Sequence, residues 1–365
     1  MGHFRKNLLT VFMTENCSLA CRYCYLNEVR PEKPKSIDVN FVKQGIIDFF
    51  KDNSPAIRFF GNGEPTLEFK KMQDIWEYAD IAAGGNLYSE LQTNGFFNDT
   101  VCDWIIEHID MIWVSCDGFP EVQNIHRPTI IGGESAEVVE RNIRKLAGAG
   151  KRVGVRATIG NLNVNRQEEM IDYFVSLGVK AVFGDHLCMP VSGEACKGEK
   201  DILVEVGPLE YAEAFVRART YADTKGLFYS NFLMVNFDEA VSINCRSSLP
   251  APHLTPSGYV SSCDMVSGPT NTPLDDLVYG QYDEAKNRIT YDESKIEKIR
   301  TRRWDQIPEC QACEIVKYCA GGCAGEAINE SGDFYGVKKN LCGATRYLAS
   351  IYGVGYKERF TYIHP

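Results

Sequence analysis

The stretch Cys17-Ser18-Leu19-Ala20-Cys21-Arg22-Tyr23-Cys24 follows closely after the apolar run at residues 8–13. Its three cysteines have C-x3-C-x2-C spacing, and a tight loop leaving a strand can turn three such thiolates toward one iron–sulfur cluster. The stretch has no fourth cysteine, so one iron would lack a protein ligand and could bind a small molecule. This indicates a reactive cluster rather than a structural one. Taken alone, the three cysteines also fit a partial zinc site or a cluster with a remote fourth ligand.

Strand-like and helix-like segments alternate along the first 224 of the 365 residues. Short apolar runs predict strands at residues 8–13, 56–60, 87–92, 111–115, 152–159 and 179–183. Between and after them, apolar residues recur at helical spacing in residues 41–50, 72–79, 100–109, 136–149, 167–177 and 209–224. Ser36 or Asp38 can cap the first of these helices.

Six strand–helix units predict an α/β protein whose parallel sheet carries its helices on the outside. Six units fall short of the eight that close a barrel, so we expect a partial (β/α)6 TIM-like barrel over residues 1–236. From about residue 237 the alternation stops, Pro and Gly become more frequent, and cysteines return. We expect residues 237–365 to form a second, small, cysteine-rich domain with few regular elements.

Small and polar residues follow the ends of the expected strands. Gly61-Asn62-Gly63-Glu64-Pro65 follows the second strand, Thr93-Asn94-Gly95 follows the third, Ser115 ends the fourth, and Arg156 lies on the fifth. Because function gathers at the C-terminal ends of parallel strands, these residues can share a pocket. Glu64 offers a carboxylate to a cation and Arg156 can hold a carboxylate, which together suit a zwitterion that carries a sugar. Simpler roles stay open: Asn94 and Ser115 could form turns, and Glu64 could be a helix N-terminal charge.

With this motif and these residues, the chain resembles the radical S-adenosylmethionine (SAM) enzymes. The resemblance implies a [4Fe-4S] cluster on Cys17, Cys21 and Cys24, whose open iron is chelated by the amino and carboxylate groups of SAM. It also implies SAM contacts from Tyr23 beside the cluster and adenine, from Asn62, Gly63 and Glu64 at the amino group, and from Asn94, Ser115 and Arg156 at the ribose or carboxylate. Asn62 departs from the family pattern, which has a glycine at that place.

Seven more cysteines lie in the C-terminal region, where Cys245-x12-Gly258-x4-Cys263 precedes a C-x2-C-x5-C-x3-C run and a last cysteine. Eight thiolates would fill two clusters, so seven leave one set short by a ligand. The run alone could also hold structural zinc. The whole pattern resembles the SPASM domain of radical SAM enzymes that mature peptides and proteins. This implies two auxiliary [4Fe-4S] clusters, an outer one on Cys310, Cys313, Cys319 and Cys342 and an inner one on Cys245, Cys263 and Cys323.

The inner set leaves one iron without a cysteine of its own. A substrate thiolate, Cys188, Cys196 or water could bind it. Asp264 directly follows Cys263, and the resemblance to sulfatase-maturing members implies that it takes the substrate proton as a general base. Asp264 could instead be a loop residue that bonds backbone N–H groups. Cys102 and Cys116 are expected to be small buried side chains.

The resemblance implies that SAM is cleaved to methionine and a 5'-deoxyadenosyl radical, which removes a hydrogen atom from a residue in a peptide or protein. The products would be thioether or carbon–carbon crosslinks, oxidised residues or epimers. Anaerobic sulfatase maturation, which forms formylglycine, is the alternative. Against it, the chain has Gly61-Asn62 where those enzymes usually show glutamine and glycine, and it lacks their extra cysteine after Cys245. A non-enzymatic iron–sulfur or zinc scaffold or electron carrier is the rival from another class.

The composition limits which classes of partner and which location are expected. The formal net charge of -10 argues against nucleic acid and anionic membrane surfaces. No apolar run reaches the roughly 20 residues of a membrane span, and the N-terminus lacks a secretion signal, so we expect a cytoplasmic protein. Fourteen cysteines then indicate metal ligands or reduced thiols rather than disulfides. Expected partners are the peptide or protein substrate and an electron donor such as flavodoxin or ferredoxin. If a leader peptide is needed, a separate leader-binding protein or the edge of the barrel must bind it, because few residues precede the first strand.

Overall fold

The computed structural model describes residues 7–24, 32–187 and 203–355. One curved sheet organises the fold, with its strands in the order β11-β10-β9-β8-β1-β2-β3-β4-β5-β6-β7. Its central part is a parallel run of seven neighbours. These strands are β1 (Leu9–Phe12), β2 (Ala56–Phe60), β3 (Tyr88–Thr93), β4 (Met111–Ser115), β5 (Arg152–Ile159), β6 (Ala181–His186) and β7 (Phe228–Ser230).

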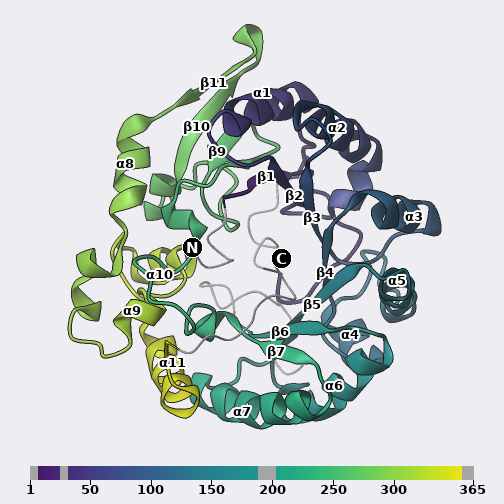
Figure 1. Cartoon of the computed structure of the whole chain (residues 1–365), viewed down its shortest axis with the longest axis vertical. Coiled ribbons are helices and arrows are strands. Elements are labelled where there is room, and N and C mark those ends of the chain that lie inside the picture. The colour runs from purple at the N-terminus through teal and green to yellow at the C-terminus, as the bar shows by residue number, and fades with distance from the viewer. Residues whose placement is uncertain (1–6, 25–31, 188–202, 356–365) are drawn as a thin grey trace.

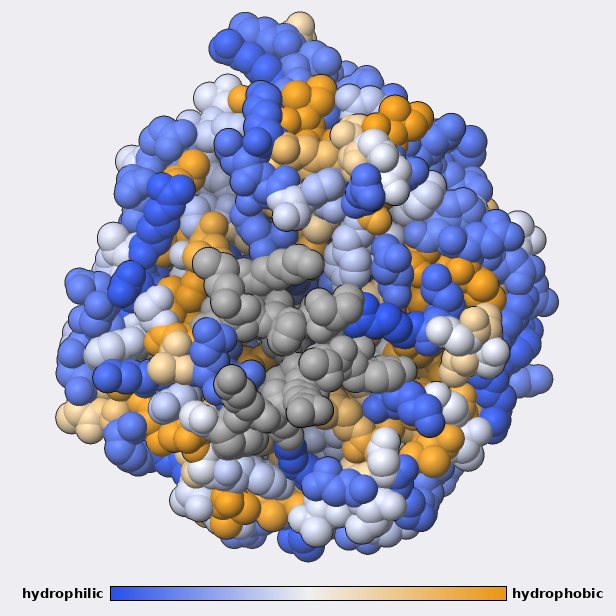
Figure 2. Space-filling view, viewed as in Figure 1, coloured by the Kyte–Doolittle hydropathy of each residue, from blue (hydrophilic) through white to orange (hydrophobic). Residues whose placement is uncertain are grey.

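Helices cover the outer face of this parallel run (Figure 1). They are α1 (Val39–Phe50), α2 (Phe69–Ala82), α3 (Asp99–His108), α4 (Pro120–His126), α5 (Ala136–Gly148), α6 (Gln167–Ser176) and α7 (Pro208–Thr224). The amphipathic pattern explains their placement, because apolar positions such as Val139, Ile143 and Leu146 of α5 are buried. Asp38 caps α1 by accepting hydrogen bonds from two backbone N–H groups. Hydrophilic residues dominate the outer rim of the face in Figure 2.

The C-terminal region extends the sheet at one edge and packs against a helix near the other. Its strand β8 (His253–Leu254) pairs in parallel with β1, and β9 (Tyr259–Ser261), β10 (Val278–Asp283) and β11 (Arg288–Tyr291) continue antiparallel. After α8 (Glu293–Thr301), α9 (Val316–Cys319) and α10 (Ala324–Ser331), helix α11 (Lys339–Tyr352) packs against α7. The C-terminal region therefore bridges the gap that an incomplete barrel would leave open (Figure 1).

The α/β class with its parallel core is confirmed. The structure adds one parallel strand to the expected six, since β7 has only three residues and gives no periodic signal. It also adds α4 and the strands and helices after residue 250. Because β8 pairs with β1, the sheet continues across the boundary expected at residue 236. Within the described ranges, no helix combines the length and the hydrophobicity needed to cross a membrane.

Candidate active site

The cysteine loop is held by the chain segment at residues 125–130, which begins in the last turn of α4. The backbone N–H groups of Ala20 and Arg22 donate to the carbonyls of Pro128 (2.8 Å) and His126 (2.9 Å), and an isolated bridge pairs Leu19 with Thr129. The Arg22 guanidinium also donates to the carbonyl of residue 125 (2.6 Å). Backbone pairing of this kind fixes the shape of the loop, so the three cysteines are presented by an ordered segment.

Asp117 lies at the centre of a buried polar network behind this loop. Its carboxylate is fully buried and accepts hydrogen bonds from the Tyr23 hydroxyl, from Nδ1 of His126 (3.1 Å) and from two nitrogens of Arg127 (3.0 and 3.2 Å). The backbone N–H of Thr158 adds a further bond (2.8 Å). Burial opposes ionisation, but the charge of Arg127 and the hydrogen bonds from His126 and Arg127 hold the pKa of Asp117 below its usual value.

Arg127 connects that network to the cysteines. Its Nη1 lies 3.9 Å from Sγ of Cys21. Burial raises the pKa of the Cys21 thiol to about 12, Arg127 works against this rise, and charges on Cys17 and Cys24 add to it. The three thiols are thus close enough to repel one another as thiolates. A metal cluster would relieve that repulsion, because metal binding replaces thiol protons.

Glu64 joins the loops that follow β2 and β3. Its Oε1 accepts from the backbone N–H (3.1 Å) and hydroxyl (2.7 Å) of Thr66 and from the Thr93 hydroxyl (2.7 Å). Its Oε2 accepts from the backbone N–H of Asn94 (2.7 Å). The side chain is only 1% exposed, and burial raises the pKa of Glu64 although these bonds lower it. The carboxylate caps the short 3-10 helix at residues 65–68, so the expected helix N-terminal role is present. Any role toward the SAM amino group remains a prediction, and it would act through the shape of these loops.

Asn94 and Gly63 bring the two loops against the cysteine stretch. The side-chain amide of Asn94 donates to the hydroxyl of Ser18 (3.0 Å) and lies 3.7 Å from Sγ of Cys17. Its Oδ1 also accepts from the backbone N–H of Phe96, so the expected turn is present as well. A Cβ at Gly63 would lie 2.0 Å from the carbonyl oxygen of Asn16, which leaves room for glycine alone. Asn62, the neighbour of Gly63, is 4% exposed.

Ser115 and Arg156 are adjacent residues on neighbouring strands. They are register partners on β4 and β5 at the end of the sheet where the cysteine loop lies. The Arg156 guanidinium donates to Asp185 on β6 (2.8 Å) and lies over the ring of Phe232, 4.4 Å from its centroid. Burial raises the pKa of Asp185, and Arg156 offsets part of that rise. The structure therefore gives Arg156 a carboxylate partner of its own.

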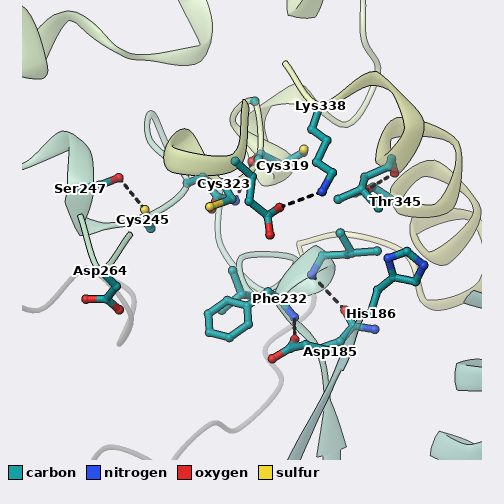
Figure 3. A pocket seen from close by; sticks show the side chains of 18 of the residues that line it. Asp185, His186, Phe232, Cys245, Ser247, Asp264, Cys319, Cys323, Lys338 and Thr345 are labelled. Carbon is teal, nitrogen blue, oxygen red and sulfur yellow. Dashed lines mark hydrogen bonds and ion pairs between the residues drawn. The ribbon is translucent and has the colours of Figure 1, made fainter. Parts of the chain in front are cut away.

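A cavity of about 410 Å³ lies between the parallel strands and the C-terminal region. Asp185, Asp264, Cys245 and Cys323 surround it in Figure 3. Arg156 lines it from the barrel side. All seven cysteines of the second group line it as well, namely Cys245, Cys263, Cys310, Cys313, Cys319, Cys323 and Cys342. The structure thus gathers onto one cavity residues that lie far apart in the sequence.

The seven cysteines fall into two sets according to which thiolate charges raise the pKa of each thiol. After burial, charges on Cys342, Cys310 and Cys313 raise the pKa of the Cys319 thiol to about 12. Burial, a nearby carboxylate and charges on Cys245 and Cys263 raise the pKa of Cys323. These are the same two sets that the SPASM resemblance implies, although their ligation of clusters remains a prediction.

Arg302 is influenced by the charges of cysteines from both sets. Its buried guanidinium donates to the carbonyls of Phe334 and Gly336. Burial lowers the pKa of Arg302, while charges on Cys245, Cys323 and Cys310, which belong to both sets, raise it. In the described residues, no three His, Cys, Asp or Glu side chains converge as ligands of a single metal ion. Seven thiols that line one cavity are the soft donors that iron–sulfur clusters take, so the donor set fits such clusters.

The carboxylate of Asp264 is held by two side chains. The Arg58 guanidinium donates to both of its carboxylate oxygens, and Nε2 of His253 lies 2.8 Å from Oδ1. Burial opposes its ionisation, but Arg58 and His253 hold the pKa of Asp264 well below its usual range. Its role as a general base remains a prediction, and the ion pair makes it a weak one.

Several residues of this site were missed in the sequence. No role was predicted for Asp117, which lies two residues after the end of the fourth expected strand; a carboxylate just after a strand was the available signal. Arg127, Arg58 and His253 carry no motif. Cys102 and Cys116 are buried, as expected. Cys188 and Cys196, two candidates for the remaining ligand, lie outside the described residues.

The chain is similar to several known proteins. A radical SAM superfamily model matches residues 11–174. An uncharacterized protein of Methanocaldococcus jannaschii is 30% identical over 182 residues, and the match spans 49% of this chain and 62% of that protein. A serine-type anaerobic sulfatase-maturating enzyme of Klebsiella aerogenes is 24% identical over 90% of this chain and 80% of its own length.

Two solved structures share the fold. Native anSMEcpe with bound AdoMet has a TM-score of 0.74 and 18% identity, covering 94% of this chain and 96% of its own. Streptococcus suis SuiB bound to the precursor peptide SuiA has a TM-score of 0.65 and 14% identity, covering 93% and 76%. The family match spans β1 to α6, which carry the three-cysteine loop and the strand-end residues around it. Residues 11–174 are therefore a radical SAM domain.

Proposed function

We propose that this protein is a radical SAM/SPASM enzyme that modifies a residue within a peptide or protein. One observation carries the proposal: a single cavity is lined by Arg156 of the radical SAM domain, by Asp264, and by all seven C-terminal cysteines. A substrate side chain in that cavity would lie between the SAM site and the auxiliary centres. The similarity to a sulfatase maturase and the fold match to the peptide-bound SuiB structure each extend over most of the chain, which adds support.

Cys17, Cys21 and Cys24 would hold the SAM-binding [4Fe-4S] cluster, and the remaining seven cysteines would hold two auxiliary clusters. When bound, the first cluster supplies the electron that cleaves SAM and so starts hydrogen abstraction from the substrate. The protein positions the reactants. Asn94 fixes the loop beside Cys17, Glu64 holds the strand-end loops together, and Arg156 and Ser115 offer polar groups to the ribose or carboxylate.

The decisive assay incubates reduced, anaerobically reconstituted protein with SAM and measures 5'-deoxyadenosine. Wild-type protein should form it, and Cys17→Ala should not, because the cluster would lose one of its three thiolates. A matched variant, Cys102→Ala, removes a buried cysteine of α3 that lies outside all three sets and should keep the activity. Formation of 5'-deoxyadenosine by Cys17→Ala would refute the cluster assignment. No product from wild-type protein would favour a non-enzymatic scaffold.

The substrate class can be tested with short peptides encoded beside this gene, analysed by mass spectrometry. Loss of two hydrogens would mean crosslinking or oxidation. Unchanged mass with deuterium taken up from solvent would mean epimerisation. Modification of none of these peptides would argue against a peptide encoded nearby as the substrate.

Sulfatase maturation is the second candidate, because Asp264 lines the cavity beside Cys263 as that reaction would require. Formylglycine formation on a peptide that carries a sulfatase cysteine or serine would establish it. The missing cysteine after Cys245 and the Arg58 ion pair at Asp264 weigh against this candidate.

We also propose a cytoplasmic location, since oxygen-sensitive clusters need a reducing compartment. A flavodoxin or ferredoxin would supply electrons. A separate protein would bind the leader of the substrate if one is needed. Pull-down of these partners from a lysate prepared without oxygen would test both interactions.

A further inference from the structure

The inner cysteine set faces a carboxylate on the first turn of α10. Cys323 is the N-cap residue of this helix, and Glu326 is the third residue inside it. A side chain at that position reaches back toward the N-cap. After burial, the charge of Glu326 is the strongest influence on the pKa of the Cys323 thiol, and it also raises that of Cys263. The carboxylate therefore lies near two of the three inner thiols.

Gly325 brings the same helical turn against Cys263. A Cβ at this position would lie 2.8 Å from Sγ of Cys263 and 2.9 Å from Sδ of Met265. Any side chain here would push the helix away from the cysteine. The close approach places the first turn of α10 between Cys263 and Cys323, and Glu326 lines the cavity together with all three inner cysteines.

Lys338 orients the carboxylate. Its Nζ lies 3.7 Å from Oε2 of Glu326, and the lysine side chain is 13% exposed. Within the described part of the chain, Oε1 takes part in no hydrogen bond or ion pair. One oxygen is thus held by a cation while the other is available to a ligand in the cavity. The lysine also balances the carboxylate charge, which lowers the cost of keeping it beside thiolates.

Among the described residues, Asp264 also lies beside this set, but its carboxylate is already engaged by Arg58 and His253. Ser247 is a further oxygen donor there. Its hydroxyl lies 2.8 Å from Sγ of Cys245, so it is already engaged with a thiol. The Ser247 hydroxyl would have to lose its proton to bind iron as an anion, whereas a carboxylate binds iron as an anion without this step. Glu326 is therefore the better protein donor for the fourth position.

We infer that Glu326 is the fourth protein ligand of the inner auxiliary cluster and binds, through Oε1, the iron that Cys245, Cys263 and Cys323 leave open. This inference rests on the proposed function, because it presupposes the inner cluster. Non-cysteine ligation of a cluster iron is established chemistry, as in centres where histidines replace two cysteines. A carboxylate is a harder ligand than a thiolate. A substrate thiolate can therefore displace it, while Glu326 keeps its ion pair with Lys338.

The test uses the full-length, reconstituted chain with Cys17, Cys21 and Cys24 replaced by alanine, so that only auxiliary clusters contribute to the spectra. Iron and sulfide are counted first. Brief ferricyanide oxidation is then followed by electron paramagnetic resonance, which detects the three-iron cluster left when the most weakly held iron departs. Glu326→Gln should lose this iron about tenfold faster than the parent or more, since even outer-shell losses cost roughly 10–100-fold in metal affinity. Glu326→Cys should lose it more slowly than the parent.

Glu330→Gln is the matched control, because Glu330 also pairs with Lys338 (3.9 Å) but is exposed and does not line the cavity. It should behave like the parent. If the parent and Glu326→Gln both contain iron for two clusters and lose it at the same rate, Glu326 is not a ligand, although the inner cluster itself is present. Iron for only one cluster in the parent would overturn the inner cluster itself, and the ligand with it. If Glu326→Gln does not fold, slower loss from Glu326→Cys still supports the ligand, and an unchanged rate overturns it.

Discussion

Arg58 on β2 and Asp264, 206 residues further along the chain, form an ion pair on the wall of the central cavity. The Arg58 side chain is 6% exposed and that of Asp264 is 41% exposed, so the carboxylate faces the cavity while its partner is buried behind it. This pair ties the radical SAM domain to the cysteine-rich region beside Cys263. It also gives Asp264 a low affinity for protons, which a substrate-facing base must overcome.

The first prediction concerns Asp264→Asn. If Asp264 takes the substrate proton, this variant should modify peptide about 10²–10⁴-fold more slowly, the usual contribution of a general base. SAM cleavage should continue, because Asp264 lies apart from the three-cysteine loop. The measurement is the ratio of modified peptide to 5'-deoxyadenosine. Asp276→Asn, which alters an exposed pair with Lys298, should leave the ratio unchanged. An unchanged ratio in Asp264→Asn would show that Asp264 is not the general base and has only a structural role.

The second prediction concerns Asp117→Asn. This change leaves the Arg127 guanidinium buried without its counter-charge, which should lower the free energy of unfolding by about 3–5 kcal/mol. Urea unfolding of both proteins at neutral pH measures the difference. Arg127 would also lose its orientation toward Cys21, so bound iron should be released faster in air. A decrease in the free energy of unfolding of less than about 1 kcal/mol would mean that the remaining residues of the network rearrange to compensate for the lost charge of Asp117.

The pH dependence of that difference follows from the depressed pKa of Asp117. A carboxyl group whose folded pKa is lowered stabilises the protein fully above its unfolded pKa of about 3.9, and this contribution is lost as pH falls further. The stability gap between wild type and Asp117→Asn should therefore stay constant from pH 8 to about pH 5 and narrow below about pH 4. A gap that closed already near pH 6 would show that Asp117 titrates in its normal range or above.

The third prediction concerns Glu64→Gln. Each carboxylate oxygen of Glu64 accepts a backbone N–H, from Thr66 on one side and Asn94 on the other. A glutamine must turn its NH2 group toward one of them, whichever way the amide lies. One buried N–H would lose its acceptor, at a cost of about 1–3 kcal/mol. Calorimetric unfolding and SAM titration should show lower stability together with weaker binding.

Glu77→Gln, on the exposed side of α2, is the matched control for this change and should alter neither quantity. Wild-type SAM affinity in Glu64→Gln, despite reduced stability, would mean that the two loops do not shape the SAM site.

The alternation of strands and helices could be predicted because local periodicity determines it. The bounds of β2, β4 and β5 match the predicted strands, since β2 and β4 bury four of their five residues and the apolar residues of β5 are buried. Helix α4 could not be predicted, since its seven residues complete fewer than two full turns of pattern. Strands β8 and β9 are shorter still, and their pairing partners lie far away in the sequence or are themselves short: β8 pairs with β1, and β9 pairs with β8 and β10.

The site also combines features that the sequence indicates with features that depend on contacts between distant segments. The resemblance to the SPASM domain implied the two C-terminal cysteine sets, and the structure brings all seven of these cysteines to one cavity. The partners of Asp264 and Asp117 depend on contacts between distant segments, which no local pattern records. Glu64 is the instructive case. A carboxylate after a strand suggested a ligand for a cation, whereas its four accepted hydrogen bonds show that it joins two loops.

The last prediction concerns Gly63→Ala. A methyl group would lie 2.0 Å from the carbonyl oxygen of Asn16, and that carbonyl accepts the backbone N–H of Glu64 (2.7 Å). The loop after β2 must then move away from the cysteine stretch, and overpacking of this kind costs about 1–3 kcal/mol. The expected result is a SAM dissociation constant raised by about tenfold or more, which corresponds to about 1.4 kcal/mol of binding free energy.

Gly148→Ala provides the comparison, because Gly148 ends α5 with open space around it. Alanine is the better helix former there and should leave SAM binding unchanged while stabilising the fold slightly. Isothermal titration of reconstituted protein with SAM, done without oxygen, measures both variants. Because Gly63 contacts the cysteine stretch only through the backbone, normal SAM binding by Gly63→Ala at full iron content would show that this contact is not needed for the cofactor site.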